Sequence, residues 1–420
     1  MDKFIIEGKA KLAGEIEVNG SKNAAGALIS ATLLTDQKCV LHNVPKVLDI
    51  LNLLDILKEM GCQVDWVGER TVQIQSGEFV DPQKIDFEKF SKSRVSVLLL
   101  GALVARFKDF KISRPGGDRI GLRPITTHLQ ALNELGVEVE EQGDFYYFKV
   151  QNLKGKEIVL SEFSVTATET LLMAVCLAQG ETIIKIAAQE PHVIDLIKML
   201  RAMGADIEEI GGHTLKIQGA KSLNGVEYTV TPDYLEAGTF AIMAALTGSR
   251  VLIKNFPFEQ LNLFLAKLQE IGVNFKRRGD CLEVLESRDL KAVRVQALPH
   301  PGFPTDLLPL IVPLLTQANG KSLIHDPLYE NRLQYTQELR KMGADIEIVD
   351  PHRAFILGPT LLKGVTIESW DIRAGASLVG AALIADGKTT IKNIEQIDRG
   401  YECLEKRLNK LGANIKRVSN

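Results

Sequence analysis

The sequence predicts an α/β protein of two domains, each built from three copies of one repeated unit, and three observations support this. The first is that six helical patterns end in a hydrophobic residue followed by glycine, with an alternating strand pattern directly after it. A glycine just past a helix favours the left-handed conformation that ends helices, and recurrence at one period indicates a repeat. Between 68 and 75 residues separate successive glycines of this set: Gly61, Gly136, Gly204, Gly272, Gly343 and Gly412.

The second observation is a helix in each repeat that is apolar on nearly all sides, which predicts six helices buried inside the domains. None of them reaches the roughly 20 unbroken apolar residues of a membrane span. The repeated unit is therefore predicted to run strand, buried helix, strand, amphipathic helix, strand, strand. The six apolar segments are 22–34, 93–107, 166–178, 235–246, 305–318 and 373–385.

The third observation is that the last repeat lacks a strand pair whose pattern is present in the first residues of the chain. We therefore expect residues 1–20 to complete the sixth repeat, so that the chain crosses between domains twice. The predicted domains are 21–231, which carries a loop at 113–124, and a discontinuous one of 1–20 plus 232–420. The two crossings could act as a hinge.

Composition limits the class of function. A hydrophobic content of 45% and a charged content of 25% are typical of a soluble globular protein. The net charge of −3 predicts no general affinity for nucleic acid or anionic membranes. Five cysteines without CxxC spacing and no apolar leader indicate a cytoplasmic protein. No cluster has metal-ligand spacing, so neither a metal nor a cofactor is expected.

Charged residues recur at the starts of the buried helices. We interpret Glu169 and Glu236 as capping or surface charges. The cations Lys22, Arg94 and Arg373 oppose the helix dipole, so a negative group is expected beside each. At the start of the fifth buried helix, Thr305 is expected to cap the helix, with Asp306 in its first turn.

The loop 113–124 departs most from the repeat and combines glycines with charges. Its glycines permit large backbone changes, which is typical of a lid that closes over an anion. The equivalent loops of other repeats are also charged, so we expect two lobes to close on one polyanionic substrate. The charged residues of these loops are Arg114, Asp118, Arg119, Arg123, Glu190, His192, Asp195, Glu330, Arg332, Asp398 and Arg399.

Six motifs stand out along the chain: GSKNAA (20–25), RPGGDRIGLRP (114–124), FPTD (303–306), ENR (330–332), DIRAGASL (371–378) and IDRGYE (397–402). Taken together, they resemble the UDP-N-acetylglucosamine 1-carboxyvinyltransferase family of enolpyruvyl transferases over essentially the whole chain. The resemblance implies two inside-out α/β domains. It also implies transfer of the enolpyruvyl group of phosphoenolpyruvate to the 3′-hydroxyl of UDP-N-acetylglucosamine with release of phosphate. This is the first committed step of peptidoglycan synthesis, and it links the chain to cell-wall biogenesis, cell shape, the cell cycle and cell division.

The resemblance also assigns roles to residues of this chain. The implied catalytic residues are Lys22, Asp118, Asp306 and Arg399, where Asp306 takes the 3′-hydroxyl proton and later a methyl proton. The phosphoenolpyruvate set is Lys22, Asn23, Arg123, Arg373 and Arg399, with Asn23 also facing the sugar. The nucleotide-sugar set is Arg94, Arg123, Pro124, Ile125, Thr126, Thr127, Ser164, Val165, Asp306 and Leu328. Several Lys and Arg suit a metal-free site for substrates that carry phosphates and a carboxylate.

Some positions depart from the family pattern. Asp118 replaces the usual lid cysteine and can still deliver a proton. Because no thiolate remains for fosfomycin to alkylate, insensitivity to that drug is predicted. Glu162, Phe163 and Thr166 differ near the implied nucleotide site, as do Thr126 and Arg114, and these changes could alter nucleotide contacts.

Three alternatives stay open at this point. A catalytically silent paralogue that binds UDP-sugars fits the changes at Glu162 and Thr166. A 3-phosphoshikimate 1-carboxyvinyltransferase shares fold and reaction, but its expected GSKS-type and GNSGT-type motifs are absent from the sequence. An RNA 3′-phosphate cyclase-like protein would need a histidine motif and a basic surface. The favoured interpretation is a cytoplasmic, monomeric enzyme with two small-molecule substrates and no nucleic-acid or membrane partner.

Overall fold

The computed structural model describes residues 2–118 and 120–419, and contacts divide the chain into two compact units. The first unit consists of Gly20–Gly117 and Arg123–Thr231. The second consists of Met1–Asn19, Asp118–Leu122 and Pro232–Asn420. The short segment Asp118–Leu122 thus makes its contacts with the second unit, although the flanking residues on both sides belong to the first.

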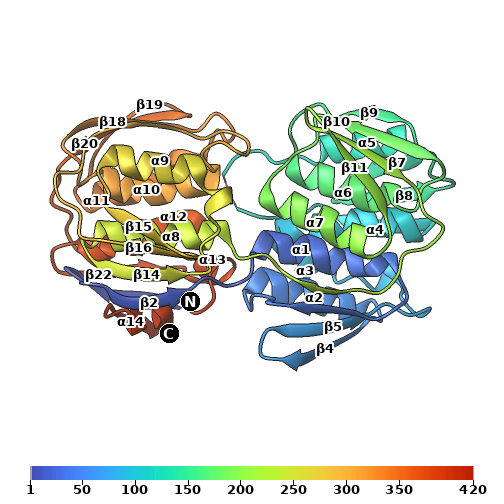
Figure 1. Cartoon of the computed structure of the whole chain (residues 1–420), viewed down its shortest axis with the longest axis horizontal. Helices are drawn as coiled ribbons and strands as arrows, with labels where there is room; N and C mark the ends of the chain where they lie inside the picture. The colour runs from blue at the N-terminus through green and yellow to red at the C-terminus, as the bar shows by residue number, and fades with distance from the viewer. Residues whose placement is uncertain (1, 119, 420) are drawn as a thin grey trace. The chain divides into compact units, whose positions relative to one another are not determined.

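The first unit contains three sheets around a bundle of helices (Figure 1). Its buried helices are α1 (Lys22–Ala31), α4 (Leu99–Arg106) and α6 (Val165–Val175). The more amphipathic ones are α2 (Leu48–Glu59), α3 (Phe87–Lys92), α5 (Thr126–Glu134) and α7 (Pro191–Ala202). In one sheet the strand order is β13 (Glu227–Thr229), β3 (Cys39–His42), β5 (Thr71–Gln75), β4 (Gln63–Gly68). In the three-stranded sheet it is β6 (Asp109–Ser113), β8 (Phe145–Val150), β7 (Val137–Gln142). In the remaining sheet it is β11 (Asp206–Gly211), β12 (Thr214–Gln218), β10 (Glu181–Lys185), β9 (Glu157–Val159).

The second unit repeats this plan. Its buried helices are α8 (Tyr234–Leu246), α10 (Leu308–Leu315) and α12 (Ile372–Ile384). The others are α9 (Asn262–Ile271), α11 (Thr336–Lys341), α13 (Glu395–Asp398) and α14 (Leu404–Lys410). In one sheet the strand order is β21 (Thr366–Glu368), β22 (Lys388–Lys392), β1 (Lys3–Glu7), β23 (Asn414–Val418). In the second it is β15 (Phe275–Arg278), β16 (Cys281–Val284), β14 (Arg250–Lys254), β2 (Ala13–Glu17). In the third it is β17 (Arg294–Gln296), β18 (Gly320–His325), β20 (Arg353–Gly358), β19 (Asp345–Asp350).

Helix endings at the repeat glycines are confirmed. All six have a φ between 91° and 104°, the left-handed region that a side chain disfavours. The repeat is less regular at its first strand. Each four-stranded sheet has one parallel pair, but the sheet of β6, β8 and β7 has only antiparallel pairs. In the second repeat, residues 87–92 form helix α3 in the stretch before the buried helix.

Residues 1–20 were expected to complete the sixth repeat, and only the first strand of this segment does so. Strand β1 pairs antiparallel with β22 and β23, with Ile5 opposite Thr390 and Lys416. Strand β2 instead pairs in parallel with β14 of the fourth repeat, with Ile16 opposite Ile253. Similarly, β13 pairs in parallel with β3 of the first repeat. Each strand before a crossing therefore stays in the unit that the chain is about to leave.

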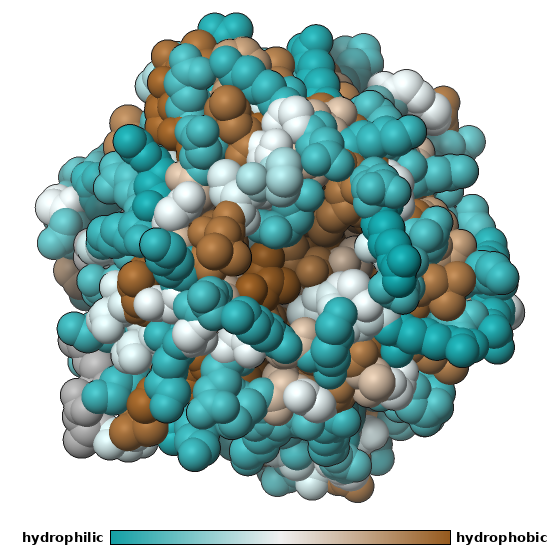
Figure 2. Space-filling model, turned by 90° about the vertical axis from the view of Figure 1, so that its left-hand side faces the viewer, coloured by the Kyte–Doolittle hydropathy of each residue, from teal (hydrophilic) through white to brown (hydrophobic). Residues whose placement is uncertain are grey.

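Each unit has its own hydrophobic core, formed by the apolar helices and the inner faces of the sheets. Figure 2 shows one face of the second unit, where hydrophobic side chains gather in the middle and hydrophilic ones surround them. This is the arrangement expected when apolar helices pack inside three amphipathic sheets. No helix among the described residues is long and apolar enough to cross a membrane.

Candidate active site

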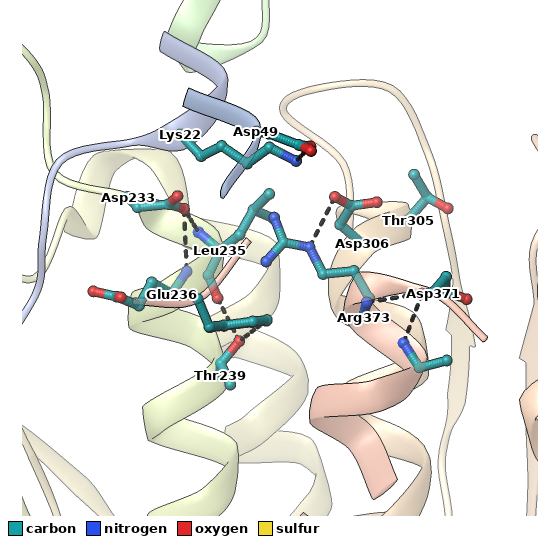
Figure 3. Close-up of polar contacts among 12 residues, drawn as sticks. Lys22, Asp49, Asp233, Leu235, Glu236, Thr239, Thr305, Asp306, Asp371 and Arg373 are labelled. Atoms are coloured by element: carbon teal, nitrogen blue, oxygen red, sulfur yellow. Dashed lines mark hydrogen bonds and ion pairs between the residues drawn. The ribbon is translucent and has the colours of Figure 1, made fainter. Parts of the chain in front are cut away.

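The second unit holds Asp306 between two arginines at the start of the fifth buried helix. Arg332 Nη2 donates to Asp306 Oδ1 at 2.7 Å, and Arg373 Nε donates to Oδ2 at 3.1 Å (Figure 3 shows the contact with Arg373). Both arginine side chains are almost fully buried, at 1% and 3% exposed, whereas that of Asp306 is 30% exposed. Burial alone would raise the pKa of Asp306, but the charges of Arg332 and Arg373 outweigh it and hold the pKa well below its ordinary value.

Asp306 lies in a short 3-10 helix, Thr305–Leu307, and α10 begins only at Leu308. The expected cap at Thr305 is wrong. Its hydroxyl donates to the buried carboxylate of Asp326, which also accepts the backbone N–H of Leu328. Asp326 thus ties the loop that carries Leu328 to the residue before Asp306.

Arg373 enters this cluster from the first turn of α12. The N-cap residue Asp371 accepts hydrogen bonds from the backbone N–H groups of Arg373 and Ala374, each at 2.8 Å. The guanidinium of Arg373 also lies over the ring of Tyr401, at 5.1 Å. Burial raises the pKa of Asp371 despite the nearby charge of Arg332, and the charge of Asp118 raises it further. The negative group expected beside Arg373 is therefore supplied by the protein itself.

The tip of the predicted lid is held on the same unit. Arg399 Nη1 donates to Asp118 Oδ1 at 2.7 Å and to Gln396 Oε1 at 2.8 Å. The side chains of Arg399 and Asp118 are each 13% exposed. Arg119, another charge predicted for this loop, lies outside the described residues.

In the first unit, Lys22 begins helix α1. Ser21 caps this helix by accepting the backbone N–H of Ala24. Lys22 Nζ pairs with Asp49 Oδ2 at 2.6 Å, and the side chains are 8% and 2% exposed (Figure 3). Lys22 is thus a buried cation with a buried carboxylate, as the opposing helix dipole required. Asn23, the next residue, is partly exposed.

Arg94 shapes the second half of the lid segment. Its guanidinium donates to the backbone carbonyls of Arg123 and Pro124, the latter at 3.1 Å. Gly117 (φ 130°) lies close to both arginines, because a Cβ there would be 3.0 Å from Arg94 and 3.1 Å from the guanidinium of Arg123. Arg94 therefore binds the backbone at Arg123 and Pro124. Ile125, in the N-cap position of α5, is buried at 2% exposed.

Two of the residues that depart from the family pattern, Glu162 and Thr166, form hydrogen bonds with the start of α5 in the first unit. Thr127 donates to Glu162 at 2.9 Å and lies 3.1 Å from the hydroxyl of Ser161. The buried His128 hydrogen-bonds the Thr166 hydroxyl through Nε2 at 2.9 Å. Burial, together with the charge of Arg94, lowers the pKa of His128 to about 3, so its imidazole is neutral at neutral pH.

The flanking positions are more open. Phe163 is exposed and packs edge-on against His213, with ring centroids 4.7 Å apart. Ser164 occupies the N-cap position of α6, and Val165 begins that helix. Thr126, at the start of α5, is exposed.

Two sequence interpretations are wrong. Glu169 and Glu236 are not surface charges but buried, at 1% and 4% exposed. Glu236 pairs with Arg407 and accepts the N–H of Asn19. Glu169 lies in α6, where burial and the charge of Glu190 raise its pKa well above the ordinary value.

The predicted site residues fall in both units. Asp371, Asp326 and Asp49 contact them and were not predicted, whereas Arg332 was predicted only as one of the charged loop residues. Asp371 stands within the DIRAGASL motif, which is a sequence signal for it. Asp49 lies in an ordinary amphipathic helix and gives no sequence signal. The predicted site residues in the second unit are Asp118, Asp306, Leu328, Arg373 and Arg399. The predicted site residues in the first unit are Lys22, Asn23, Arg94, Arg123, Pro124, Ile125, Thr126, Thr127, Ser164 and Val165.

Among the described residues, no group of three or more His, Cys, Asp or Glu side chains could hold a metal ion. What the cluster offers is cationic: guanidinium groups suited to bind phosphate and carboxylate.

Comparisons with known proteins agree with this chemistry. The family model of EPSP synthase (3-phosphoshikimate 1-carboxyvinyltransferase) matches residues 6–408. The chain is 43% identical to UDP-N-acetylglucosamine 1-carboxyvinyltransferase 1 of Carboxydothermus hydrogenoformans, over all of this chain and 99% of that protein. It is 42% identical to UDP-N-acetylglucosamine 1-carboxyvinyltransferase of Koribacter versatilis, over all of this chain and 97% of the relative.

Solved structures share the fold. The enolpyruvyl transferase NikO from Streptomyces tendae superposes with a TM-score of 0.91 at 24% identity, covering 100% of this chain and 99% of NikO. EPSP synthase from Acinetobacter baumannii superposes with a TM-score of 0.76 at 21% identity, covering all of both chains.

Proposed function

Because the chain belongs to the enolpyruvyl transferase family, alongside the UDP-N-acetylglucosamine 1-carboxyvinyltransferases, we propose that it catalyses their reaction. It transfers the enolpyruvyl group of phosphoenolpyruvate to the 3′-hydroxyl of UDP-N-acetylglucosamine and releases phosphate. The observation that carries this proposal is the similarity to those enzymes over the entire chain. The reaction places the protein at the start of peptidoglycan synthesis, as a cytoplasmic monomer that acts on two small molecules.

We propose that the two units are the domains 21–231 and 1–20 plus 232–420, with the substrate-binding residues divided between them. Lys22, Asn23, Arg123, Arg373 and Arg399 bind the carboxylate and phosphate of phosphoenolpyruvate. The side chains at the N-termini of α5 and α6, with Arg94, bind the nucleotide sugar. Arg94 also positions Arg123 and Pro124 through its hydrogen bonds to their carbonyls.

Asp306 accepts the proton of the 3′-hydroxyl. With both its oxygens bonded to guanidinium groups, its carboxylate is a weak base, because basicity falls with pKa. When the substrate's anionic groups bind Arg373, Asp306 loses one of its two partners and its basicity rises. Arg332, which is deeply buried, keeps the carboxylate oriented throughout. The charge of phosphoenolpyruvate thereby prepares the base for the 3′-hydroxyl.

Asp118 supplies the proton that the enolpyruvyl double bond needs for addition of the hydroxyl. A carboxylate at this place gives fosfomycin no thiolate to alkylate. The protein is therefore expected to keep its activity after preincubation with the drug.

One assay tests the function and the drug prediction together. Phosphate release is measured with phosphoenolpyruvate and UDP-N-acetylglucosamine, singly and together, with and without fosfomycin preincubation. Release that needs both substrates and survives the drug is expected. Nucleotide-sugar binding without phosphate release would instead identify a catalytically silent paralogue. Release with shikimate 3-phosphate in place of the nucleotide sugar would identify the other acceptor class. Time-dependent loss of activity would contradict the role of Asp118 in drug insensitivity.

A further inference from the structure

The contact between Asp118 and Arg399 joins the predicted lid acid to an arginine predicted to bind substrate. The two residues are 281 positions apart in the chain, yet Arg399 Nη1 lies 2.7 Å from Asp118 Oδ1. Each side chain is only 13% exposed. A pair this sheltered is screened by solvent far less than a surface ion pair.

Residues 120–122 are fitted to the same surface. The carbonyl of Ile120 accepts the backbone N–H of Asn331 at 3.1 Å, and the N–H of Leu122 donates to Glu330 Oε1 at 2.7 Å. Gly121 has a φ of 141°, and a Cβ there would come within 2.5 Å of the Glu330 carboxylate. Backbone contacts and a required glycine therefore hold Asp118 against Arg399.

Further carboxylates and guanidinium groups surround this pair. Burial is the main cause of the raised pKa of Asp371, and the charge of Asp118 raises it further, so these two carboxylates lie close enough to interact. Adding a phosphate dianion to a sheltered cluster that already contains carboxylates brings like charges together, which is unfavourable unless one carboxylate moves away. The cluster includes the carboxylates Asp118, Asp306 and Asp371 and the guanidinium groups Arg332, Arg373 and Arg399.

We propose that Asp118 is an internal substitute for the substrate's phosphate: it occupies Arg399 in the empty enzyme and is displaced when the phosphate binds. The inference rests on the proposed function for the identity of the ligand. A phosphate group offers more oxygens and more charge than one carboxylate, so it competes successfully for a guanidinium. The displaced Asp118 carboxylate must then take up a proton from solvent before it can donate one to the substrate, and displacement occurs only when a substrate is present to receive that proton.

This exchange predicts that removal of the carboxylate improves anion binding. The dissociation constant of inorganic phosphate is measured by calorimetry on the full-length protein, for wild type and Asp118→Asn. We expect phosphate to bind about 3- to 30-fold more tightly to Asp118→Asn, the range expected when one charge stops competing for a sheltered partner. Catalytic turnover is expected to fall in the same variant, so affinity and turnover change in opposite directions.

Asp398→Asn is the matched control. Asp398 is in α13 beside Arg399 but pairs with Arg417, at 2.6 and 2.8 Å. The Asp398→Asn substitution removes the same charge from a neighbouring position without releasing Arg399. Phosphate affinity is therefore expected to change less than about 2-fold, as for a charge that interacts only at a distance. In an Arg399→Ala background, Asp118→Asn is expected to have no further effect on phosphate binding.

The outcomes separate this inference from the proposed function. Equal or weaker phosphate binding by Asp118→Asn overturns the exchange, even if wild type releases phosphate from both substrates. The same holds if neither protein binds phosphate, or if Asp398→Asn tightens binding equally. Tighter binding by Asp118→Asn alone supports the exchange, even where the transferase assay fails. Thermal unfolding of each variant verifies that it is folded.

Discussion

The two units share one repeat plan but place ionisable groups in their cores differently. The second unit sets arginines against carboxylates around Asp306, so its carboxylate is held in the charged form. The first unit buries one lysine–aspartate pair, Lys22–Asp49, and elsewhere relies on uncharged groups such as His128 and Thr166. Its buried Glu169 has a raised pKa, the reverse of Asp306. The same fold therefore accommodates buried carboxylates with pKa shifts in opposite directions.

The largest expected effect is on catalysis in the second unit. Asp306→Asn preserves shape but removes the proton acceptor, so turnover in the phosphate-release assay should fall about 10²- to 10⁴-fold. Asp350→Asn is the control, because that carboxylate, at the end of β19, pairs with Arg353 of β20 and not with the arginines of the cluster. Full activity in Asp306→Asn would contradict the role of Asp306 as the proton acceptor.

Next in size is the stability of the cluster itself. Arg332→Ala removes a deeply buried partner of Asp306, and breaking a buried ion pair in this way typically costs about 3–5 kcal/mol. Arg353→Ala breaks an exposed pair of the same type and should change stability little. Urea unfolding compares the two variants. Equal losses would mean that burial does not set the strength of these pairs.

The pH dependence of stability should have opposite signs in the two units. Asp306 has a lowered pKa, so its contribution is present above the unfolded value of about 3.9 and is lost as pH falls through the folded value. The advantage of wild type over Asp306→Asn should therefore grow as pH rises toward 5.

Glu169 has a raised pKa, so its contribution is present below about pH 4.3 and is lost as pH rises through the folded value. The stability of Glu169→Gln relative to wild type should therefore increase as pH rises above 4. Each slope is at most about 1.4 kcal/mol per pH unit. The stability difference between wild type and each variant is measured by urea unfolding from pH 3 to 8. If this difference changed with pH in the same direction for both variants, the contrast between the two units would be contradicted.

The smallest effect concerns the uncharged network of the first unit. Thr166→Val keeps the shape but leaves Nε2 of the buried His128 without its hydrogen bond, which should cost about 1–2 kcal/mol. Thr214→Val is the control, since that hydroxyl bonds the Gly212 carbonyl at an exposed turn. Thermal unfolding that ranks the two variants equally would show that the network adds no stability.

Much of the fold was predictable because it depends on local rules. The glycine positions and the apolar helices follow from backbone conformation and periodicity, and both occur as predicted. The pairing partner of β2 was not predictable, because its residue pattern fits either sheet. Its pairing with β14 depends on where the chain crosses between the two units. The burial of Glu169 and Glu236 was missed because a charge at a helix start looks the same in sequence whether exposed or buried.

For the candidate site, the motifs identified cations but not their partners. Lys22, Arg94 and Arg373 were predicted to need compensation because they oppose a helix dipole. That Asp49 compensates Lys22, and that Asp306 compensates Arg373, depends on side chains that meet across helices. Arg332 was predicted as a charged loop residue facing a polyanionic substrate, and only the tertiary structure shows that it is buried beside Asp306.

The sequence by itself determined the repeat, the α/β class, the buried helices and the family, because each depends on residue order along the chain. The tertiary structure alone decided which charges neutralise which. Asp118 and Arg399, 281 residues apart, meet only because Ile120, Leu122 and the glycine between them fit one surface. Coulomb interactions and desolvation act through distances in space, which residue order does not specify.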